Sequence, residues 1–224
     1  MGNIVILSII YLVGIALLLA FNELNYRRLK IKGEFTRKFA HFTATLATVP
    51  LVYIFPSHWY ILILAVLFFA ILFFTQNGKQ LNSIHDISRK SIGSYLLPLS
   101  IYVTFLIASY LHNKFIYILP MLILAICDPM AAILGMNIKK GNGHICLLGH
   151  EYKKTWLGSG AFLVISFIIS IIALYFHRGL FDFKTFWLAL VIGVVSMLAE
   201  FFSWRGSDNL SIPLSTVIVL LLFL

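Results

Sequence analysis

Long apolar runs, separated by short polar connections, make up most of this chain. Runs of about 17 to 22 residues match the length that a helix needs to cross roughly 30 Å of hydrocarbon. The last run is short, so its helix must tilt little, begin near Asn209 or cross a thin part of the bilayer. We therefore expect an all-α, polytopic integral membrane protein with one domain, residues 1–224, and short loops. The eight expected transmembrane helices cover 3–21, 36–55, 58–75, 93–111, 114–136, 157–177, 184–202 and 208–224.

The composition supports the same class. Hydrophobic residues make up 61% of the chain and charged residues 11%, whereas about a quarter of the residues in soluble domains are charged. The two cysteines, Cys127 and Cys146, show neither a disulfide framework nor a zinc spacing. The N-terminus lacks a basic segment and a cleavage site, so we expect no removed signal peptide.

The basic residues predict an orientation. Of the 17 Lys and Arg residues, 14 fall in the first, third, fifth and seventh connections, and only Lys114, Arg178 and Lys184 fall on the other side. Positively charged connections stay in the cytoplasm. We therefore expect both termini on the opposite side of the membrane. The net charge of +9 fits this bias and anionic headgroups, or an anionic substrate, but no nucleic-acid module is present.

Five of the 8 acidic residues lie in short clusters at the ends of apolar runs. Since a carboxylate near a bilayer is costly, this placement indicates a membrane enzyme that handles an anionic substrate. In the first cluster, Arg37 and Lys38 are suited to hold phosphate oxygens and His41 to donate or carry a proton. An interfacial anchor held by salt bridges is the structural alternative.

Asp128 is the most informative single residue, because it lies about two turns inside the predicted fifth helix. Ala131, Ala132 and Gly135 share its helix face, and small residues let another helix or a ligand approach closely. We expect Asp128 to act as a general base or a metal ligand. A structural ion pair with a neighbouring Lys or Arg is the alternative.

Lys154 and Thr155 lead into Gly158 and Ser159 at the start of the predicted sixth helix. Free N–H groups and the positive end of the helix dipole favour phosphate at such a position. The chain has no GxxxxGK[ST] run, so the segment is not a Walker loop. Gly and Ser serve close helix packing equally well.

Glu200 lies near the end of the predicted seventh helix, and the segment from Arg205 to Asn209 bridges to the eighth. Together with Asp128, Glu200 and Asp208 offer oxygen ligands for Mg²⁺, with phosphates completing the shell. Asp208 or Asn209 is equally suited to cap the eighth helix.

In this order, the clusters resemble the polyprenol kinase family of dolichol kinases, phytol kinases and CTP-dependent diacylglycerol kinases. The resemblance covers most of the chain, from about Glu34 to Pro213. Its parts are Glu34-x-x-Arg37-Lys38-x-x-His41, Asp128-Pro129-x-Ala131-Ala132-x-x-Gly135, Lys154-Thr155-x-x-Gly158-Ser159, and Glu200 followed by Gly206-x-Asp208-Asn209-Leu210-x-x-Pro213.

The resemblance implies transfer of the terminal phosphate of CTP to the hydroxyl of a membrane lipid alcohol, with Mg²⁺. One departure is Leu157, where these enzymes often carry an acid. By position, the residues implied to line the nucleotide and metal site are Asp128, Lys154, Thr155, Gly158, Glu200, Asp208 and Asn209.

Phosphoryl transfer requires mainly cations around the transferred phosphate and a carboxylate near the acceptor hydroxyl. We assign Mg²⁺ to Asp208 and Glu200, and phosphate oxygens to Lys154 and Arg205.

Two other functions fit parts of the sequence. Asp128 and the run Lys153-Lys154-Thr155-Trp156 also resemble CTP:phosphatidate cytidylyltransferases, although the C-terminal region lacks the Lys-Asp and His-Gly-Gly signature of those enzymes. A lipid transporter also carries intramembrane charges, but it should show inverted repeats and polar groups near the midplane. Here the polar groups crowd one face and no repeat is visible.

Overall fold

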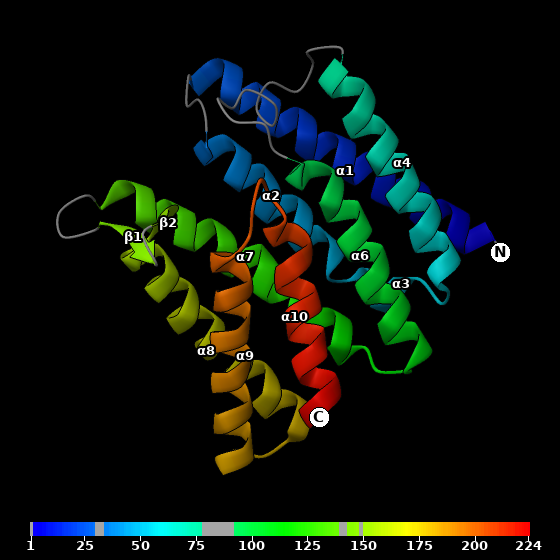
Figure 1. Ribbon diagram of the computed structural model, residues 1–224. Coiled ribbons are helices and arrows are strands. Elements are labelled where there is room, and N and C mark those ends of the chain that lie inside the picture. Colours follow the sequence, from blue (N-terminus) through cyan, green and yellow to red (C-terminus); the bar gives the residue numbers. More distant parts are fainter. Residues whose placement is uncertain (1, 30–33, 78–91, 139–142, 148–149) are drawn as a thin grey trace.

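The computed structural model describes residues 2–29, 34–77, 92–138, 143–147 and 150–224 as a helical bundle (Figure 1). Six of its helices are long and apolar enough to cross a membrane, which confirms an all-α, multi-pass integral membrane protein. The helices are α1 (Gly2–Leu29), α2 (Glu34–Thr48), α3 (Leu51–Ile54), α4 (His58–Asn77), α6 (Gly93–Tyr110), α7 (Phe115–Asn137), α8 (Trp156–Arg178), α9 (Phe183–Phe201) and α10 (Asp208–Phe223).

Two of the eight predicted spans do not become long apolar helices. The span expected at 36–55 divides into α2 and α3 on either side of Pro50, which has no N–H to donate. Charged residues also occupy the first turns of α2. The last predicted span becomes α10, whose 16 residues extend only about 24 Å.

Helix α7 forms the core of the bundle. It packs against α2, α6, α8 and α10, and 56% of its apolar span is buried. Leu119, Ile123, Leu124 and Cys127 are completely buried. A helix surrounded by others in this way must be apolar on all sides, so the charge of Asp128 on α7 requires a specific partner.

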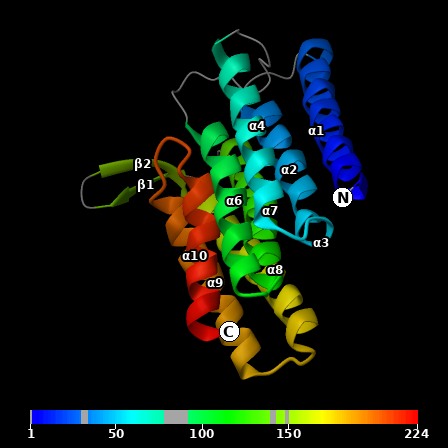
Figure 2. The same cartoon turned by 90° about the vertical axis from the view of Figure 1, so that its right-hand side faces the viewer.

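The connection between α7 and α8 holds an element that the sequence did not predict, a two-stranded antiparallel hairpin of β1 (His144–Leu147) and β2 (His150–Thr155). It projects from the side of the bundle (Figure 2). Such a hairpin is marginally stable alone, but β2 runs directly into α8. Lys154 and Thr155 are therefore the last residues of a strand.

Successive long helices alternate in direction, so one end of the bundle collects the starts of α2, α6, α8 and α10 and the ends of α1, α4, α7 and α9. We call it the charged end. Arg89 and Lys90, two of the basic residues of the third connection, lie outside the described residues.

Candidate functional site

A buried ion pair joins α2 to α7 at the charged end. Lys38 Nζ lies 2.7 Å from Oδ1 and 2.6 Å from Oδ2 of Asp128, and the two side chains are only 8% and 4% exposed. The structural alternative considered for Asp128 is thus present, and its partner is Lys38. Because both charges are removed from water, each depends on the other for compensation.

His41 lies one turn beyond Lys38 on α2 and faces the same carboxylate. Its Nε2 is 3.7 Å from Asp128 Oδ2, which is too long for a hydrogen bond. Among the described residues, this buried nitrogen has no hydrogen-bond partner. Arg37 and Asp208 also interact electrostatically with His41. The imidazole is therefore close to the carboxylate without being held by it.

A second ion pair joins β2 to α9. Lys154 Nζ donates to Oε1 of Glu200, whose side chain is 6% exposed. Burial alone would lower the pKa of Lys154, but attraction to Glu200, Asp208 and Asp128 outweighs it and raises the pKa above its ordinary value. Lys154 is therefore a cation at neutral pH.

The two ion pairs belong to one cluster. Lys154 interacts electrostatically with Asp128 as well as with Glu200 and Asp208, and Glu200 interacts with both aspartates. The cluster joins residues from α2, α7, β2, α9 and the first turn of α10. The structure thus brings together predicted residues from four separate motifs at one end of the bundle.

Thr155 has a definite structural role at the start of α8. Its side-chain oxygen accepts a hydrogen bond of 3.2 Å from the backbone N–H of Gly158, which caps the helix. A Cβ placed on Gly135 would lie 2.7 Å from this oxygen, and one on Gly158 would lie 3.1 Å from the Ala131 carbonyl oxygen. The small residues on the Asp128 face of α7 therefore allow the start of α8 to pack closely against α7.

Ser159 and Leu157 lie in the same first turn of α8. The Ser159 side chain is buried, and its Oγ has no hydrogen-bond partner among the described residues. Leu157 is 36% exposed, so an acid at this position would not have been buried.

Asn209 fastens α10 to α6. Its Nδ2 donates a 2.7 Å hydrogen bond to the carbonyl of Gly93, and the Ile92 N–H donates to the carbonyl of Arg205 at 2.9 Å. A Cβ on Gly93 would approach Asn209 Nδ2 and Gly206 O to 3.1 Å. Gly93 is a positioning residue that the sequence analysis did not single out, although a glycine at a helix start is a visible signal.

Arg205 lies in the connection between α9 and α10. Its guanidinium lies over the Trp204 ring, 4.2 Å from the centroid, which is a favourable cation–π geometry. Its φ of 50° is positive, a conformation that is uncommon outside glycine. Its assignment to phosphate oxygens stays a prediction.

The residues suited to Mg²⁺ are Glu200 and Asp208. No group of three or more His, Cys, Asp or Glu residues is placed to hold a metal ion within the described ranges. Magnesium, however, is commonly bound by one or two carboxylates with phosphates and water completing the shell. The buried Oε2 of Glu200 has no hydrogen-bond partner among the described residues, so this pair of carboxylates fits that kind of site.

Comparison of the chain with protein-family models, with curated proteins and with solved structures finds no match in any of the three. The proposals for this site therefore rest on its own geometry and on the motif resemblance of the sequence.

Proposed function

We propose that this protein is a membrane lipid kinase that transfers the terminal phosphate of CTP to the hydroxyl of a lipid alcohol, with Mg²⁺. The observation that carries the proposal is the single cluster of Lys38, Asp128, Lys154, Glu200 and Asp208 at one end of a transmembrane bundle. Phosphoryl transfer needs cations around the phosphate and a proton acceptor for the hydroxyl. The cluster offers both at one end of a bundle of membrane-spanning length.

In the proposed reaction, the oxygen of the lipid hydroxyl forms a bond to the γ-phosphorus of CTP. The bond from that phosphorus to the bridging oxygen breaks, and CDP leaves. The hydroxyl proton has two acceptors 3.7 Å apart, the Asp128 carboxylate and Nε2 of His41. Lys38 holds the carboxylate in place.

Lys154 is the cation best placed to bind phosphate oxygens, because it is protonated at neutral pH and interacts electrostatically with both carboxylates proposed for Mg²⁺. Magnesium would neutralise charge on the phosphates and orient them. Glu200 keeps Lys154 in place through Oε1 and presents Oε2. Asn209 positions Asp208 by fastening the start of α10 to α6.

We also propose that the charged end faces the cytoplasm, where nucleotides are available. The support is the concentration of basic residues in the connections at this end.

The test uses purified protein in detergent, a panel of lipid alcohols, Mg²⁺, and CTP labelled at either the γ or the α phosphate. Label that reaches lipid from the γ position alone is the expected result, and it identifies the acceptor. Label from the α position would mean that a cytidylyl group had moved, as in a cytidylyltransferase. No transfer with CTP, UTP or ATP would overturn the proposal and favour transport.

A further inference from the structure

The two lysines of the ion-pair cluster hold their carboxylates in different ways. Lys38 Nζ contacts both carboxylate oxygens of Asp128, at 2.6 and 2.7 Å, and its side chain is 8% exposed. Lys154 Nζ contacts only Oε1 of Glu200, and its side chain is 26% exposed. The Oε2 atom of Glu200 is buried and has no hydrogen-bond partner among the described residues. Lys38 is therefore fixed on its carboxylate more firmly than Lys154 is on Glu200.

The elements that carry the two lysines support this distinction. Lys38 belongs to α2, which packs against α1 and α7, whereas Lys154 is near the end of β2 in the two-stranded hairpin. A hairpin of two strands is marginally stable by itself, and the lysine side chain is a flexible four-carbon stem that ends in a compact charge. The ammonium group of Lys154 is thus able to change partner by rotation about its own side-chain bonds.

Lys154 compensates three carboxylates at once. It interacts electrostatically with each carboxylate of the cluster, which are Asp128, Glu200 and Asp208, and Glu200 also interacts with both aspartates. Since like charges repel, the ammonium group is part of what allows the three carboxylates to lie together. A divalent cation supplies the same compensation, because Mg²⁺ is bound through one or two carboxylates and phosphates. Lys154 and the metal therefore compete for Glu200, and their repulsion opposes simultaneous binding there.

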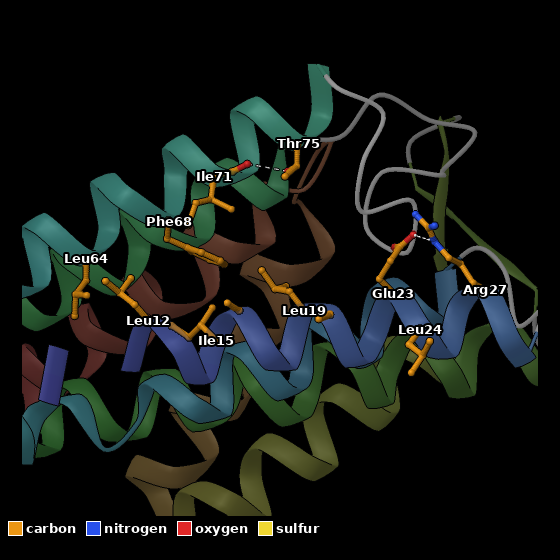
Figure 3. A pocket seen from close by; sticks show the side chains of 12 residues that line it. Leu12, Ile15, Leu19, Glu23, Leu24, Arg27, Leu64, Phe68, Ile71 and Thr75 are labelled. Atoms are coloured by element: carbon orange, nitrogen blue, oxygen red, sulfur yellow. Dashed lines mark hydrogen bonds and ion pairs between the residues drawn. The ribbon is translucent and has the colours of Figure 1, made fainter. Parts of the chain in front are cut away.

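An open apolar groove of about 690 Å³ between α1 and α4 offers no comparable position (Figure 3). Glu23 is the only acidic residue among its described lining residues, and Arg27 on the next turn of α1 donates to Oε1 of Glu23 at 2.8 Å. A pair of carboxylates for a divalent cation is therefore found in the cluster and not among the described residues of this groove.

We propose that Lys154 takes the place of the divalent cation at Glu200 until a phosphate binds, so that cation and phosphate enter the site together. Phosphate oxygens attract ammonium groups. Lys154 then moves from Oε1 of Glu200 to a phosphate oxygen, and both oxygens of Glu200 become available to the metal. That the phosphate belongs to CTP rests on the proposed function, whereas the exchange itself requires only a polyphosphate and a divalent cation. By linkage, the polyphosphate strengthens binding of the metal by the same factor by which the metal strengthens binding of the polyphosphate.

The test is equilibrium dialysis of the purified protein in detergent, with Mn²⁺ as the probe, since carboxylates and phosphates suit Mn²⁺ as they do Mg²⁺. Protein-bound Mn²⁺ is measured at the same free Mn²⁺ concentration alone, with CTP, and with inorganic tripolyphosphate. No lipid alcohol is added, so the readout does not depend on phosphoryl transfer. We expect the affinity of wild type for Mn²⁺ to rise about tenfold or more with either polyphosphate, the size of effect that one nearby charge has on proton affinity. A rise with tripolyphosphate but not with CTP would support the exchange and count against the nucleotide kinase.

Lys154→Met removes the competing charge and keeps most of the side-chain length. This variant should bind Mn²⁺ alone about tenfold more tightly than wild type does, and it should lose most of the effect of the polyphosphate. Lys184→Met is the matched control, because it makes the same change in net charge at an exposed residue in the first turn of α9, at the opposite end of the bundle. It should behave like wild type.

Thermal unfolding provides a second readout, because Lys154→Met leaves the buried carboxylate of Glu200 without its cation and should lower stability. A ligand that binds only the folded protein raises its unfolding temperature. Mg²⁺ alone should therefore raise the unfolding temperature of Lys154→Met more than that of wild type, whereas wild type should respond to Mg²⁺ and tripolyphosphate together.

Three results would overturn the proposal. The first is equally tight binding of Mn²⁺ to wild type with and without polyphosphate. The second is the same affinity for Mn²⁺ alone in Lys154→Met and in wild type. The third is an absence of Mn²⁺ binding in both proteins under every condition, which would also remove the assignment of Mg²⁺ to Glu200 and Asp208.

Discussion

Lys38 of α2 and Asp128 of α7 are 90 residues apart in sequence, yet Lys38 Nζ contacts both carboxylate oxygens of Asp128 at 2.6 and 2.7 Å. The pair is buried on both sides, with side chains 8% and 4% exposed. It therefore ties α2 to the central helix and holds the proposed proton acceptor at the same time.

These two roles separate in a double-mutant cycle. Asp128→Asn alone should lose phosphoryl transfer and also destabilise the protein by about 3 kcal/mol, because Lys38 keeps an uncompensated buried charge. Lys38→Met with Asp128→Leu should recover most of the stability but no activity. Thermal unfolding in detergent and the transfer assay measure the two effects. Near-normal turnover in Asp128→Asn would remove Asp128 from the proposed mechanism.

Gly135→Ala should disturb the start of α8. The new Cβ would lie 2.7 Å from Thr155 Oγ1, so the N-cap must shift, and loss of a cap costs about 1 kcal/mol. Because Lys154 precedes Thr155, transfer activity should fall as well. Thermal unfolding and the transfer assay measure both changes.

Gly160→Ala is the matched control for this helix end. A Cβ there meets nothing within 4 Å, so the variant should keep its activity and gain up to about 1 kcal/mol from higher helix propensity. Equal losses in the Gly135 and Gly160 variants would show that the close approach of α7 and α8 does not matter.

Glu200→Gln should raise the Mg²⁺ concentration needed for half-maximal transfer by about tenfold or more. The substitution keeps the size of the side chain but removes its negative charge from the pair with Asp208. A Mg²⁺ titration of transfer measures the effect, and Asp182→Asn outside the cluster is the control carboxylate. An unchanged Mg²⁺ requirement would exclude Glu200 from the metal site.

Asp182 makes stability depend on pH at the opposite end of the bundle. Hydrogen bonds from the Arg178 guanidinium and from the Thr185 N–H hold the pKa of this carboxyl well below its usual range. In the unfolded chain the pKa is about 3.9, so the stabilisation is present above that pH and is lost as the pH falls through lower values. Wild type should unfold at a higher temperature than Asp182→Asn at pH 7, and the difference should narrow steadily as the pH falls below about 4. A constant difference would contradict this linkage.

The local pattern of the sequence determined the class of the protein. Apolar runs of membrane-spanning length predict the helices because backbone polar groups must be satisfied within each segment in a lipid environment. The same logic does not apply where a segment leaves the hydrocarbon, which is why the β1–β2 hairpin and the break at Pro50 were not predicted. Charged positions such as Asp128 and Glu200 were visible as exceptions to the apolar pattern.

Only the tertiary structure decided which of these charged residues contact one another. From the sequence, Lys38 was expected to hold phosphate oxygens or to anchor the interface, whereas the structure pairs it with Asp128 and pairs Lys154 with Glu200. Sequence periodicity sets the face on which a residue lies, but the partner across that face depends on helix packing over distances of tens of residues.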